Sequence, residues 1–495
     1  MSRIIIQNGN MCELDLPLRF AQKLYAEFAI RHPNAFYLRT RQRGMQNWDG
    51  KIHYITKTGQ FKIGLLPKVY DMCIEMGIKP KVVDMRQPLP KVSKVVTKIG
   101  KYKLRPEQEK AVKAVINNTI GGKPFHIGVL DYTVNAGKTL IMSSLYLSYK
   151  KQLKTLLITN DSDWLNQARE EFKQYLPGED ITFVQGKVLN WSNFTIGMVQ
   201  SISRNMRFYQ KELSQIDMVL IDEADQGGSR QYQNVITRLF NTRIRIGLSG
   251  TIYMSKLAKD KVKNMNLECF FGKVLAEFKL RDSIKKGYST KTVVKMVPGK
   301  PWYGNWESDC ISYKEIYDDS ITNSYTAWLM AYSRLRWNIN QGRYPALVVC
   351  KHIAHCENLY KFFKKKLGDA YNIAYVHVNT KSKLRQQIMK DFRDGKIDIL
   401  VSTTIIARGK NFPKLRYLLN AASMDSQEKS IQFLGRLVRT DKSKKKVYLD
   451  DLHYPGPYLD RHGKHRKQYY QRQELKVILL DKLWKKHPNH SLIKS

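Results

Sequence analysis

The sequence is poor in cysteine, in acidic residues and in long apolar runs, and each scarcity excludes a class of protein. Its 495 residues include 6 cysteines and no Cys-x-x-Cys pair, which argues against a disulfide scaffold. No apolar run is long enough to cross a membrane, and the run near the N-terminus is too short for a signal peptide. We therefore expect a cytoplasmic protein without a membrane-spanning segment.

Acidic residues are scarce relative to basic ones. The 43 Asp and Glu stand against 85 Lys and Arg, which makes the formal net charge +42 at pH 7. Hydrophobic residues make up 42% of the chain, so the charge belongs to folded domains and not to a disordered polymer. Basic residues are in excess near both ends and through the middle. A polyanion is the expected partner, with nucleic acid favoured over an acidic membrane surface.

A chain of this length exceeds one compact core and predicts several domains. Residues 1–90 alternate short β-like runs with one helical pattern, which predicts a small α/β domain. Residues 91–255 and 339–452 alternate wholly apolar strands with helical stretches, the pattern of parallel sheets covered on both faces. We expect residues 256–338 to connect these blocks and residues 453–495 to form a basic helical tail.

The segment Val129–Thr139 leads from a predicted strand into a predicted helix and ends in Ala-Gly-Lys-Thr. A phosphate-binding loop needs backbone N–H groups at a helix N-terminus, a lysine for the phosphates and a hydroxyl for Mg²⁺. Lys138 and Thr139 supply the last two. The strict pattern also requires glycine where this chain has Tyr132, so this segment alone does not distinguish a phosphate loop from an ordinary turn.

A second motif, Met218–Asp225, is an apolar run that ends in three carboxylates. Acids at the carboxyl end of a parallel strand lie in the crevice where α/β sheets bind ligands. Asp222 is placed to hold Mg²⁺ and Glu223 to activate water. A solvated acidic turn is the alternative, but the apolar strand and the preceding phosphate loop argue against it.

The order and spacing of these motifs resemble the superfamily 2 helicases and translocases. Six segments carry the resemblance, from the adenine-reading segment through motifs I, II, III, V and VI: Leu104–Gln108, Thr133–Thr139, Asp222–Asp225, Ser249–Thr251, Ser402–Pro413 and Gln432–Arg439. The resemblance implies two RecA-like parallel-sheet lobes, with ATP and Mg²⁺ as cofactors.

The resemblance also implies roles for individual residues. The ATP-binding residues would be Gln108, Asn135, Ala136, Gly137, Lys138, Thr139 and Gly409. The magnesium ligands would be Thr139 and Asp222, and the coupling residues Asp225, Ser249, Gly250, Thr251 and Gln432. The catalytic residues would be Glu223, Arg436 and Arg439, with Arg439 as arginine finger and Arg436 as a second γ-phosphate contact.

Three positions depart from the family pattern. Asn135 replaces a glycine, and because asparagine tolerates left-handed backbone we expect the loop to keep its shape. Asn160 and Asp161 replace the Pro-Thr of motif Ia, which puts the usual nucleic-acid contact there in doubt. Asn411 replaces the common aspartate of motif V, so coupling there is expected to differ.

Outside the shared motifs, the chain resembles a phage branch-migration helicase in Asn47–Ile52, Lys62–Lys68 and Val349–Tyr360. The first two segments lie in the N-terminal domain, which in that group is implicated in binding double-stranded nucleic acid. The residues expected to contact nucleic acid are Arg39, Arg41, Arg43, Trp48, Lys51 and Lys68. For Trp48 itself we favour packing within the small domain, with Asp49 and Gly50 as a turn.

Two further features are interpreted as packing. Cys350, His352, His355 and Cys356 lie within seven residues, whereas structural zinc sites generally use two separated ligand pairs, so we predict no zinc. In the tail, Leu475, Leu479 and Leu483 share one face of an amphipathic stretch that we expect to dock on the second lobe.

The predicted function is an ATP-dependent DNA helicase or translocase that acts as a monomer on branched or duplex nucleic acid. Forks, displacement loops, Holliday junctions and R-loops, which contain RNA, are the implied substrates in recombination, repair or replication. The compartment would be the host cytoplasm if a phage encodes the chain. Two alternatives stay open: a DEAD-box-like RNA helicase and a non-catalytic basic strand-annealing protein, the latter disfavoured by the complete set of catalytic residues.

Overall fold

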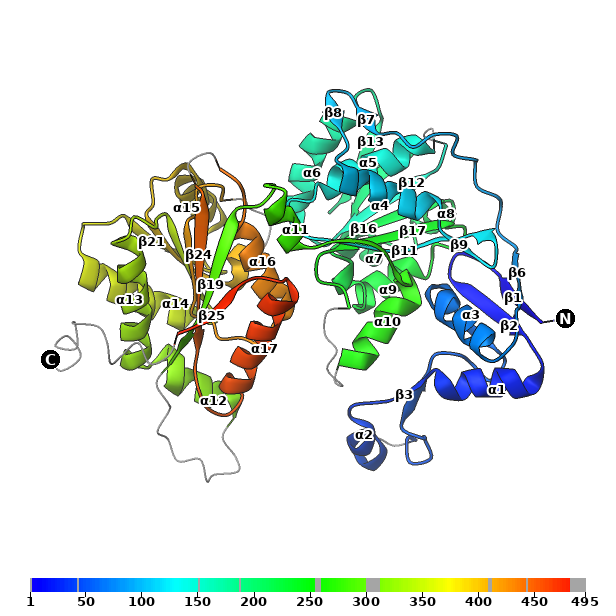
Figure 1. The fold of residues 1–495 in the computed structure, drawn as a ribbon, viewed down its shortest axis with the longest axis horizontal. Helices are drawn as coiled ribbons and strands as arrows, with labels where there is room; N and C mark the ends of the chain where they lie inside the picture. Colours follow the sequence, from blue (N-terminus) through cyan, green and yellow to red (C-terminus); the bar gives the residue numbers. More distant parts are fainter. Residues whose placement is uncertain are drawn as a thin grey trace. The chain divides into compact units, whose positions relative to one another are not determined.

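The computed structural model describes residues 2–41, 44–149, 152–186, 188–253, 260–299, 312–407, 412–441 and 444–480. The chain forms two compact units, Met1–Phe278 and Lys279–Ser495, which are described separately. In Figure 1 the first unit runs from blue to green and the second from green to red.

The first unit begins with a small four-stranded sheet whose strand order is β5-β2-β1-β6. These strands are β1 (Arg3–Ile6), β2 (Met11–Asp15), β5 (Gln60–Lys62) and β6 (Lys81–Asp84), packed with helices α1 (Leu18–Glu27) and α3 (Leu66–Glu75). Alternate residues of β1 are buried, as expected for a sheet with one covered face. A separate hairpin pairs β3 (Ala29–Arg31) with β4 (Lys51–His53), and helix α2 (Ala35–Arg41) lies between them in sequence. The predicted small α/β domain is therefore present.

The larger sheet of the first unit has the order β14-β13-β15-β12-β16-β17-β11-β18, with every neighbouring pair parallel except β13 and β14. Its strands are β11 (His126–Tyr132), β12 (Thr155–Thr159), β13 (Ile181–Gln185), β14 (Val188–Leu189), β15 (Phe194–Met198), β16 (Met218–Asp222), β17 (Ile244–Ser249) and β18 (Val274–Phe278). Its helices are α4 (Pro106–Ile116), α5 (Lys138–Ser148), α6 (Ser162–Tyr175), α7 (Val199–Arg204), α8 (Gln210–Ser214), α9 (Arg230–Ile236) and α10 (Lys261–Phe271). The central strands are buried throughout, as predicted.

The second unit contains a seven-stranded parallel sheet of order β21-β22-β20-β23-β24-β19-β25. Its strands are β19 (Lys291–Pro298), β20 (Ala346–Cys350), β21 (Ile373–Val376), β22 (Ile399–Thr403), β23 (Tyr417–Asn420), β24 (Lys446–His453) and β25 (Val477–Leu479). Its helices are α11 (Leu280–Lys285), α12 (Tyr313–Tyr317), α13 (Tyr325–Ile339), α14 (Ile353–Leu367), α15 (Ser382–Asp394), α16 (Gln427–Leu437) and α17 (Leu459–Arg472). The two parallel-sheet lobes predicted from the sequence are both present.

Two details differ from the sequence-based expectation. The connecting region 256–338 contributes a strand to each sheet, β18 to the first and β19 to the second. The basic tail forms α17, but the following stretch adds strand β25 to the second sheet instead of the amphipathic helix expected around Leu475 and Leu479. Short apolar runs do not distinguish strand from helix by periodicity, and β19 offers an open edge. Leu483 lies outside the described residues.

The N-terminal domain shares one hydrophobic core with the larger sheet of the first unit. Arg245 of β17, with 0% of its surface exposed, donates to the Gly9 carbonyl at 2.6 Å and to Asn10 Oδ1 at 2.7 Å. The segment 86–90 that the sequence predicts as a linker has no helix or strand, but Arg243 donates to the Gln87 carbonyl at 3.1 Å. The small domain is therefore docked on the first lobe and not merely tethered to it.

Candidate nucleotide site and its supporting contacts

The phosphate loop ends at helix α5, whose first residue is Lys138. Gly137 precedes the helix in left-handed backbone with φ 71°, and no side chain caps the helix N-terminus. Asn135 also takes positive φ, 62°, which confirms the expectation that asparagine would adopt the backbone of the missing glycine. An uncapped helix N-terminus presents N–H groups and the positive end of the helix dipole, which favours a phosphate.

Gln108 ties helix α4 to this loop. Its side chain is 2% exposed, Nε2 donates to the Ala136 carbonyl at 2.8 Å, and Oε1 accepts the Arg105 N–H at 2.9 Å. A Cβ atom on Gly137 would lie 2.3 Å from Gln108 Nε2 and would displace this amide, and the φ of 71° itself favours glycine. Gln108 thus positions the loop, and its contact with adenine stays a prediction.

The carboxylates of the second motif lie at the end of β16, as predicted. Lys138 Nζ lies 3.4 Å from Asp222 Oδ1, and Asp222 is 4% exposed. Among the residues that the structure describes, Asp222 Oδ1 accepts no hydrogen bond. Glu223 follows in left-handed backbone with φ 52°, a conformation that is rare for glutamate and frequent at functional sites. Burial, reinforced by Asp222 and Asp225, raises the pKa of Glu223 to about 8.

Glu223 is held by a side chain that the sequence motifs did not single out. Gln226 Nε2 donates to Glu223 Oε2 at 3.3 Å, and Gln226 Oε1 accepts a hydrogen bond from Asn160. Asp161, the other departure in motif Ia, accepts the Trp164 N–H at 3.1 Å at the start of α6. Both unusual motif Ia residues therefore make contacts within the lobe. The sequence signal for this contact was the glutamine directly after the acidic motif, because a side-chain amide can donate to one group and accept from another.

Motif III lies between motifs I and II because β17 lies between β11 and β16 in the sheet. Ser249 Oγ donates to Asp225 Oδ1 at 2.7 Å, and the Thr251 N–H donates to Ser249 Oγ at 3.1 Å. A Cβ atom on Gly250 would lie 3.1 Å from Thr133 Cα. The predicted coupling residues Asp225, Ser249, Gly250 and Thr251 are thus brought together beside the phosphate loop.

These residues fit a nucleotide and a magnesium ion. The uncapped N-terminus of α5 and the Lys138 ammonium suit phosphate oxygens. The Thr139 hydroxyl and the Asp222 carboxylate, whose Oδ1 accepts no hydrogen bond among the described residues, are oxygen ligands of the kind that Mg²⁺ prefers. The predicted ATP-site residue Gly409 lies outside the described residues, as does Asn411.

In the second unit, motif VI lies on helix α16 and just beyond it. Gln432 and Arg436 are half-buried on the helix, whereas Arg439 follows the helix, which ends at Leu437. The Thr290 N–H donates to the Val438 carbonyl at 2.8 Å, and Thr290 Oγ1 donates to the Arg439 carbonyl at 3.1 Å. Arg436 therefore lies on the helix and Arg439 lies beyond its end, where Thr290, the residue before β19, donates hydrogen bonds to the backbone.

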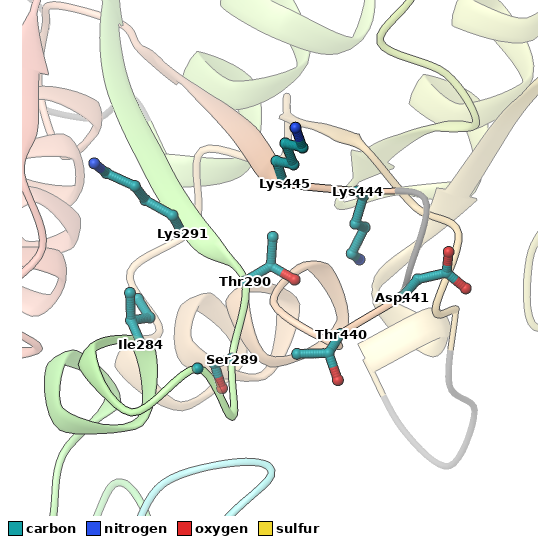
Figure 2. Close-up of a pocket in the computed structure, with 9 residues that line it drawn as sticks. Ile284, Ser289, Thr290, Lys291, Thr440, Asp441, Lys444 and Lys445 are labelled. Carbon is teal, nitrogen blue, oxygen red and sulfur yellow. The ribbon is translucent and has the colours of Figure 1, made fainter.

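A cavity of about 570 Å³ lies next to this helix end. It is lined by Ile284, Gly287, Ser289, Thr290, Lys291, Thr440, Asp441, Lys444 and Lys445 (Figure 2). Lys444 Nζ donates to the carbonyls of Leu415 and Leu437, each at 3.0 Å, so its ammonium is committed to the backbone. Burial lowers the pKa of Lys444 to about 8.

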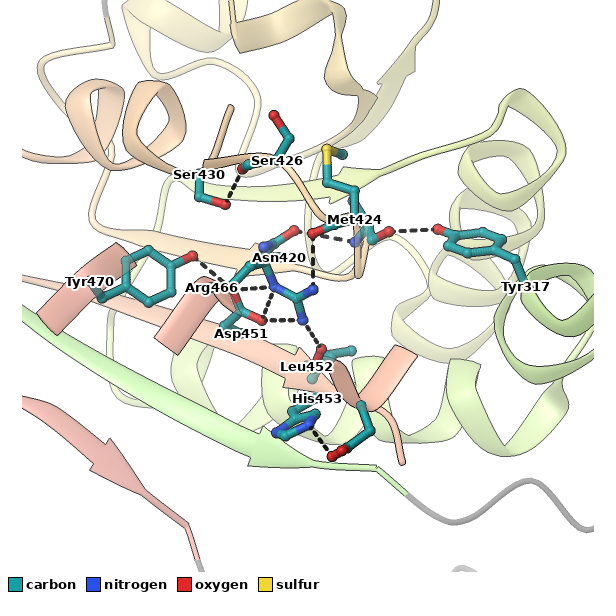
Figure 3. A network of polar contacts seen from close by, with 12 residues as sticks. Tyr317, Asn420, Met424, Ser426, Ser430, Asp451, Leu452, His453, Arg466 and Tyr470 are labelled. Carbon is teal, nitrogen blue, oxygen red and sulfur yellow. Dashed lines mark hydrogen bonds and ion pairs between the residues drawn. The ribbon is translucent and has the colours of Figure 1, made fainter. Parts of the chain in front are cut away.

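The start of α16 is held by the tail helix α17. Arg466 donates to the Met424 carbonyl at 3.0 Å, and His465 Nδ1 lies 2.9 Å from Asp425 Oδ1. Ser426, the next residue, caps α16 by accepting the Lys429 N–H. Figure 3 shows Arg466 at the centre of this network. The basic tail thus supports the helix that carries motif VI.

The Cys/His cluster at motif IV belongs to the core of the second unit. Cys350 and Cys356 are buried, and Cys356 Sγ lies 3.5 Å from the Val401 carbonyl. His352 packs edge-on against Tyr317, with ring centroids 4.8 Å apart. Burial lowers the pKa of His355 to about 3. These contacts support the packing interpretation, and the described residues contain no group of three His, Cys, Asp or Glu that could hold a metal.

The residues expected to contact nucleic acid in the N-terminal domain have different surroundings. Arg39 and Arg41 are exposed on α2, and Lys51 is exposed on β4. Lys68 instead forms an ion pair at 2.5 Å with Glu268 of α10 in the first lobe. The prediction for Arg43 concerns a residue outside the described ranges.

A Cβ atom on Gly64 would lie 2.1 Å from the Glu268 carbonyl oxygen. The Gly-Leu-Leu-Pro-Lys segment that begins at Gly64 therefore contributes to docking the small domain.

Two family models match the chain. The type III restriction enzyme res subunit model matches residues 101–254, and the helicase conserved C-terminal domain model matches residues 331–441. Each matched segment falls within one of the two parallel-sheet lobes. Among the helices of the described ranges, none combines the length and apolar character needed to span a membrane.

Individual relatives agree with these matches. The ATP-dependent DNA helicase UvsW of Enterobacteria phage T4 is 21% identical over 435 residues, which cover 82% of each chain. IRC3 of Saccharomyces cerevisiae, named as an ATP-dependent helicase, is 24% identical over 70% of this chain, and this chain spans 51% of the yeast protein.

Among solved structures, an HsdR subunit fragment of a type I restriction enzyme from Vibrio vulnificus has a TM-score of 0.57 at 14% identity. The match covers 87% of this chain and 78% of that one, and it shows the shared fold. With two helicase lobes, each carrying its motifs in the expected order, the chain belongs to the superfamily 2 helicases and is related to UvsW.

Proposed function

We propose that this protein is an ATP-dependent DNA helicase or translocase that remodels branched nucleic acid. The observation that carries the proposal is the arrangement of Lys138, Asp222 and Glu223 beside the uncapped N-terminus of α5. Lys138 would bind the phosphates, while Thr139 and Asp222 would hold Mg²⁺. Bound Mg²⁺ would neutralise phosphate charge. Glu223, whose ionised form is favoured by the charge of Lys138, would accept the proton of the attacking water.

In this proposal, Arg436 and Arg439 supply positive charge to the phosphates during hydrolysis. Because Arg439 is positioned through its own backbone by Thr290, its placement depends on the segment that leads into β19. ATP turnover would thereby be linked to the conformation of the second lobe. Translocation along nucleic acid would follow from cycles of binding and hydrolysis.

Two observations favour DNA over RNA as the substrate. The relative named as a DNA helicase aligns with 82% of this chain, whereas relatives named as RNA helicases in two yeasts align with 46%. The N-terminal domain, which lies outside both matched family models, presents exposed basic residues to a polyanion. Branched DNA is the proposed substrate because a docked basic domain beside a motor lobe offers a second surface for a duplex arm.

The central test is nucleic-acid-stimulated ATP hydrolysis. The Lys138→Ala variant should lose it, whereas Lys123→Ala, at an exposed lysine of the same lobe, should retain it. Full activity of Lys138→Ala would show that the assigned nucleotide site is wrong.

The substrate is tested by unwinding of forks, four-way junctions, R-loops and RNA duplexes over a range of salt concentrations, because affinity depends steeply on salt. Stimulation by RNA alone would identify an RNA helicase. The absence of turnover with every nucleic acid would favour a strand-annealing protein.

A further inference from the structure

Helix α2 of the N-terminal domain presents two aromatic rings to solvent. Phe36 is 79% exposed and Tyr37 is 55% exposed, whereas Ala35 on the same helix is buried. Figure 1 shows α2 at the end of the first unit, away from the four-stranded sheet. A single exposed ring needs no explanation, but two adjacent rings on one short helix offer an apolar surface to a partner.

Positive charge accompanies these rings on the same short helix. Arg39 and Arg41 are exposed, and the Arg41 guanidinium lies 5.0 Å from the centroid of the Tyr37 ring. The helix sequence, Ala-Phe-Tyr-Leu-Arg-Thr-Arg, contains no acidic residue. Aromatic rings beside arginines are the combination that binds single-stranded nucleic acid, since bases stack on the rings and phosphates pair with the guanidinium groups.

Trp48, in the neighbouring Trp-Asp-Gly segment, is not available for this role. Trp48 is half-buried, its Nε1–H donates to the Lys51 carbonyl at 2.9 Å, and its ring meets the edge of His32. Gly50 has φ 77°, and a Cβ atom there would lie 3.1 Å from the Ala35 Cβ. The turn expected at Asp49 and Gly50 lies instead at Gln46 and Asn47, and the chain only bends at Gly50, where it packs against α2. The favoured packing interpretation of Trp48 is consistent with these contacts.

We propose that Phe36, assisted by Tyr37, stacks on unpaired bases at a branch point while Arg39 and Arg41 bind the adjacent phosphates. This inference rests on the proposed function and adds to it the surface that distinguishes branched from fully paired nucleic acid. A protein partner is the competing occupant. It is disfavoured because the helix carries two arginines and no acidic residue beside its rings, and the chain as a whole carries a net charge of +42.

The test compares how Phe36→Ala and a matched control variant bind two DNAs. One DNA is a fork with 2-aminopurine at the junction, and the other is a blunt duplex of equal length. Phe208→Ala is the control because Phe208 is 80% exposed elsewhere in the same unit. Phe36→Ala should weaken fork binding about tenfold and abolish the fluorescence quenching that stacking causes. Blunt-duplex binding should stay unchanged, and Phe36→Trp should restore fork binding.

Three outcomes would overturn the proposal. Fork binding by Phe36→Ala equal to that by Phe208→Ala would show that the ring does not stack. An equal loss on fork and blunt duplex would show that it does not read unpaired bases. Unchanged nucleic-acid binding together with loss of self-association in sedimentation would assign the surface to a protein partner. The proposed function fails separately, if the wild-type chain shows no nucleic-acid-stimulated ATP hydrolysis.

Discussion

Arg466 of α17 and Asp451 of β24 form an ion pair in which both side chains are 0% exposed, with Arg466 Nη2 2.9 Å from Asp451 Oδ1. Asp451 also accepts hydrogen bonds from Asn420 at 2.8 Å and Tyr470 at 2.7 Å, as Figure 3 shows. Asp450, the preceding residue, faces the other side of the sheet and pairs with Arg334 of α13 at 2.7 Å. Successive strand residues thus fix one helix on each face of the second sheet.

Removal of Arg466 should destabilise the second unit strongly. Arg466→Met leaves the Asp451 carboxylate buried without its cation, a change that typically costs about 3–5 kcal/mol. Denaturant unfolding, followed by the circular dichroism of the helices, measures the loss. Lys464→Met is the matched control on the same helix, because the Lys464 ion pair with Asp460 is exposed and should contribute little. Equal midpoints for the two variants would contradict a structural role for the buried pair.

Glu223→Gln should abolish turnover without abolishing nucleotide binding. The amide keeps the shape of the side chain but cannot accept the proton of the attacking water, so turnover should fall by about 10²–10⁴-fold. Fluorescent-nucleotide titration and steady-state hydrolysis measure the two properties separately. Gln226→Leu, which removes the hydrogen bond to Glu223 at 3.3 Å, should reduce turnover by a smaller factor. Normal turnover in Glu223→Gln would exclude Glu223 as the base.

Lys444 predicts a specific dependence of stability on pH. Its pKa is lowered from 10.5 to about 8 by burial, so between these values the unfolded chain binds more protons than the folded one. The free energy of unfolding should therefore rise with pH across this window and be lowest below about pH 8. The free energy of unfolding of the wild type, measured relative to that of Lys444→Met, should increase by about 2 kcal/mol from about pH 7.5 to about pH 9.5. If the difference in free energy of unfolding between the two proteins does not change with pH, the pKa of Lys444 is not lowered by burial.

Gly64→Ala should loosen the N-terminal domain from the first lobe. Its new Cβ atom would lie 2.1 Å from the Glu268 carbonyl oxygen, so the backbone of one element has to move. Limited proteolysis should then cleave faster within the segment 86–90, which Arg243 holds to the first lobe through a hydrogen bond to the Gln87 carbonyl. Gly228→Ala is the control, since its Cβ atom meets only Leu267 at 3.7 Å. The same cleavage pattern in both variants would argue against docking through Gly64.

Local patterns were sufficient to bring together the residues of the candidate nucleotide site. Asp222 and Ser249 end buried strands, and Lys138 begins the helix that follows a third. Parallel pairing brings the carboxyl ends of such strands together. Asn135 could be assigned left-handed backbone from its residue type alone. The contact between Gln226 and Glu223 could not be predicted, because it depends on the unusual backbone of Glu223.

Contacts between distant segments were beyond the reach of these patterns. The sequence predicted Lys68 as a nucleic-acid contact. The fold instead places its ammonium 2.5 Å from Glu268, which lies 200 positions away. For Trp48 the sequence favoured packing over stacking, but the hydrogen bond to the Lys51 carbonyl that holds its half-buried ring is visible only in three dimensions. The exposure of Phe36, in contrast, could not be predicted, because residue type alone does not distinguish an exposed phenylalanine from a buried one.

The sequence by itself determined the order of the motifs, the two parallel sheets and the chemistry of the nucleotide site, because periodicity and strand-end residues are local properties. Only the tertiary structure decided which basic and aromatic residues remain available to a partner. It committed Lys68, Lys444 and Arg466 to contacts within the protein and left Phe36 and Arg39 exposed on α2. The physical reason is that availability depends on burial and pairing across the chain, and neither is encoded at a single position.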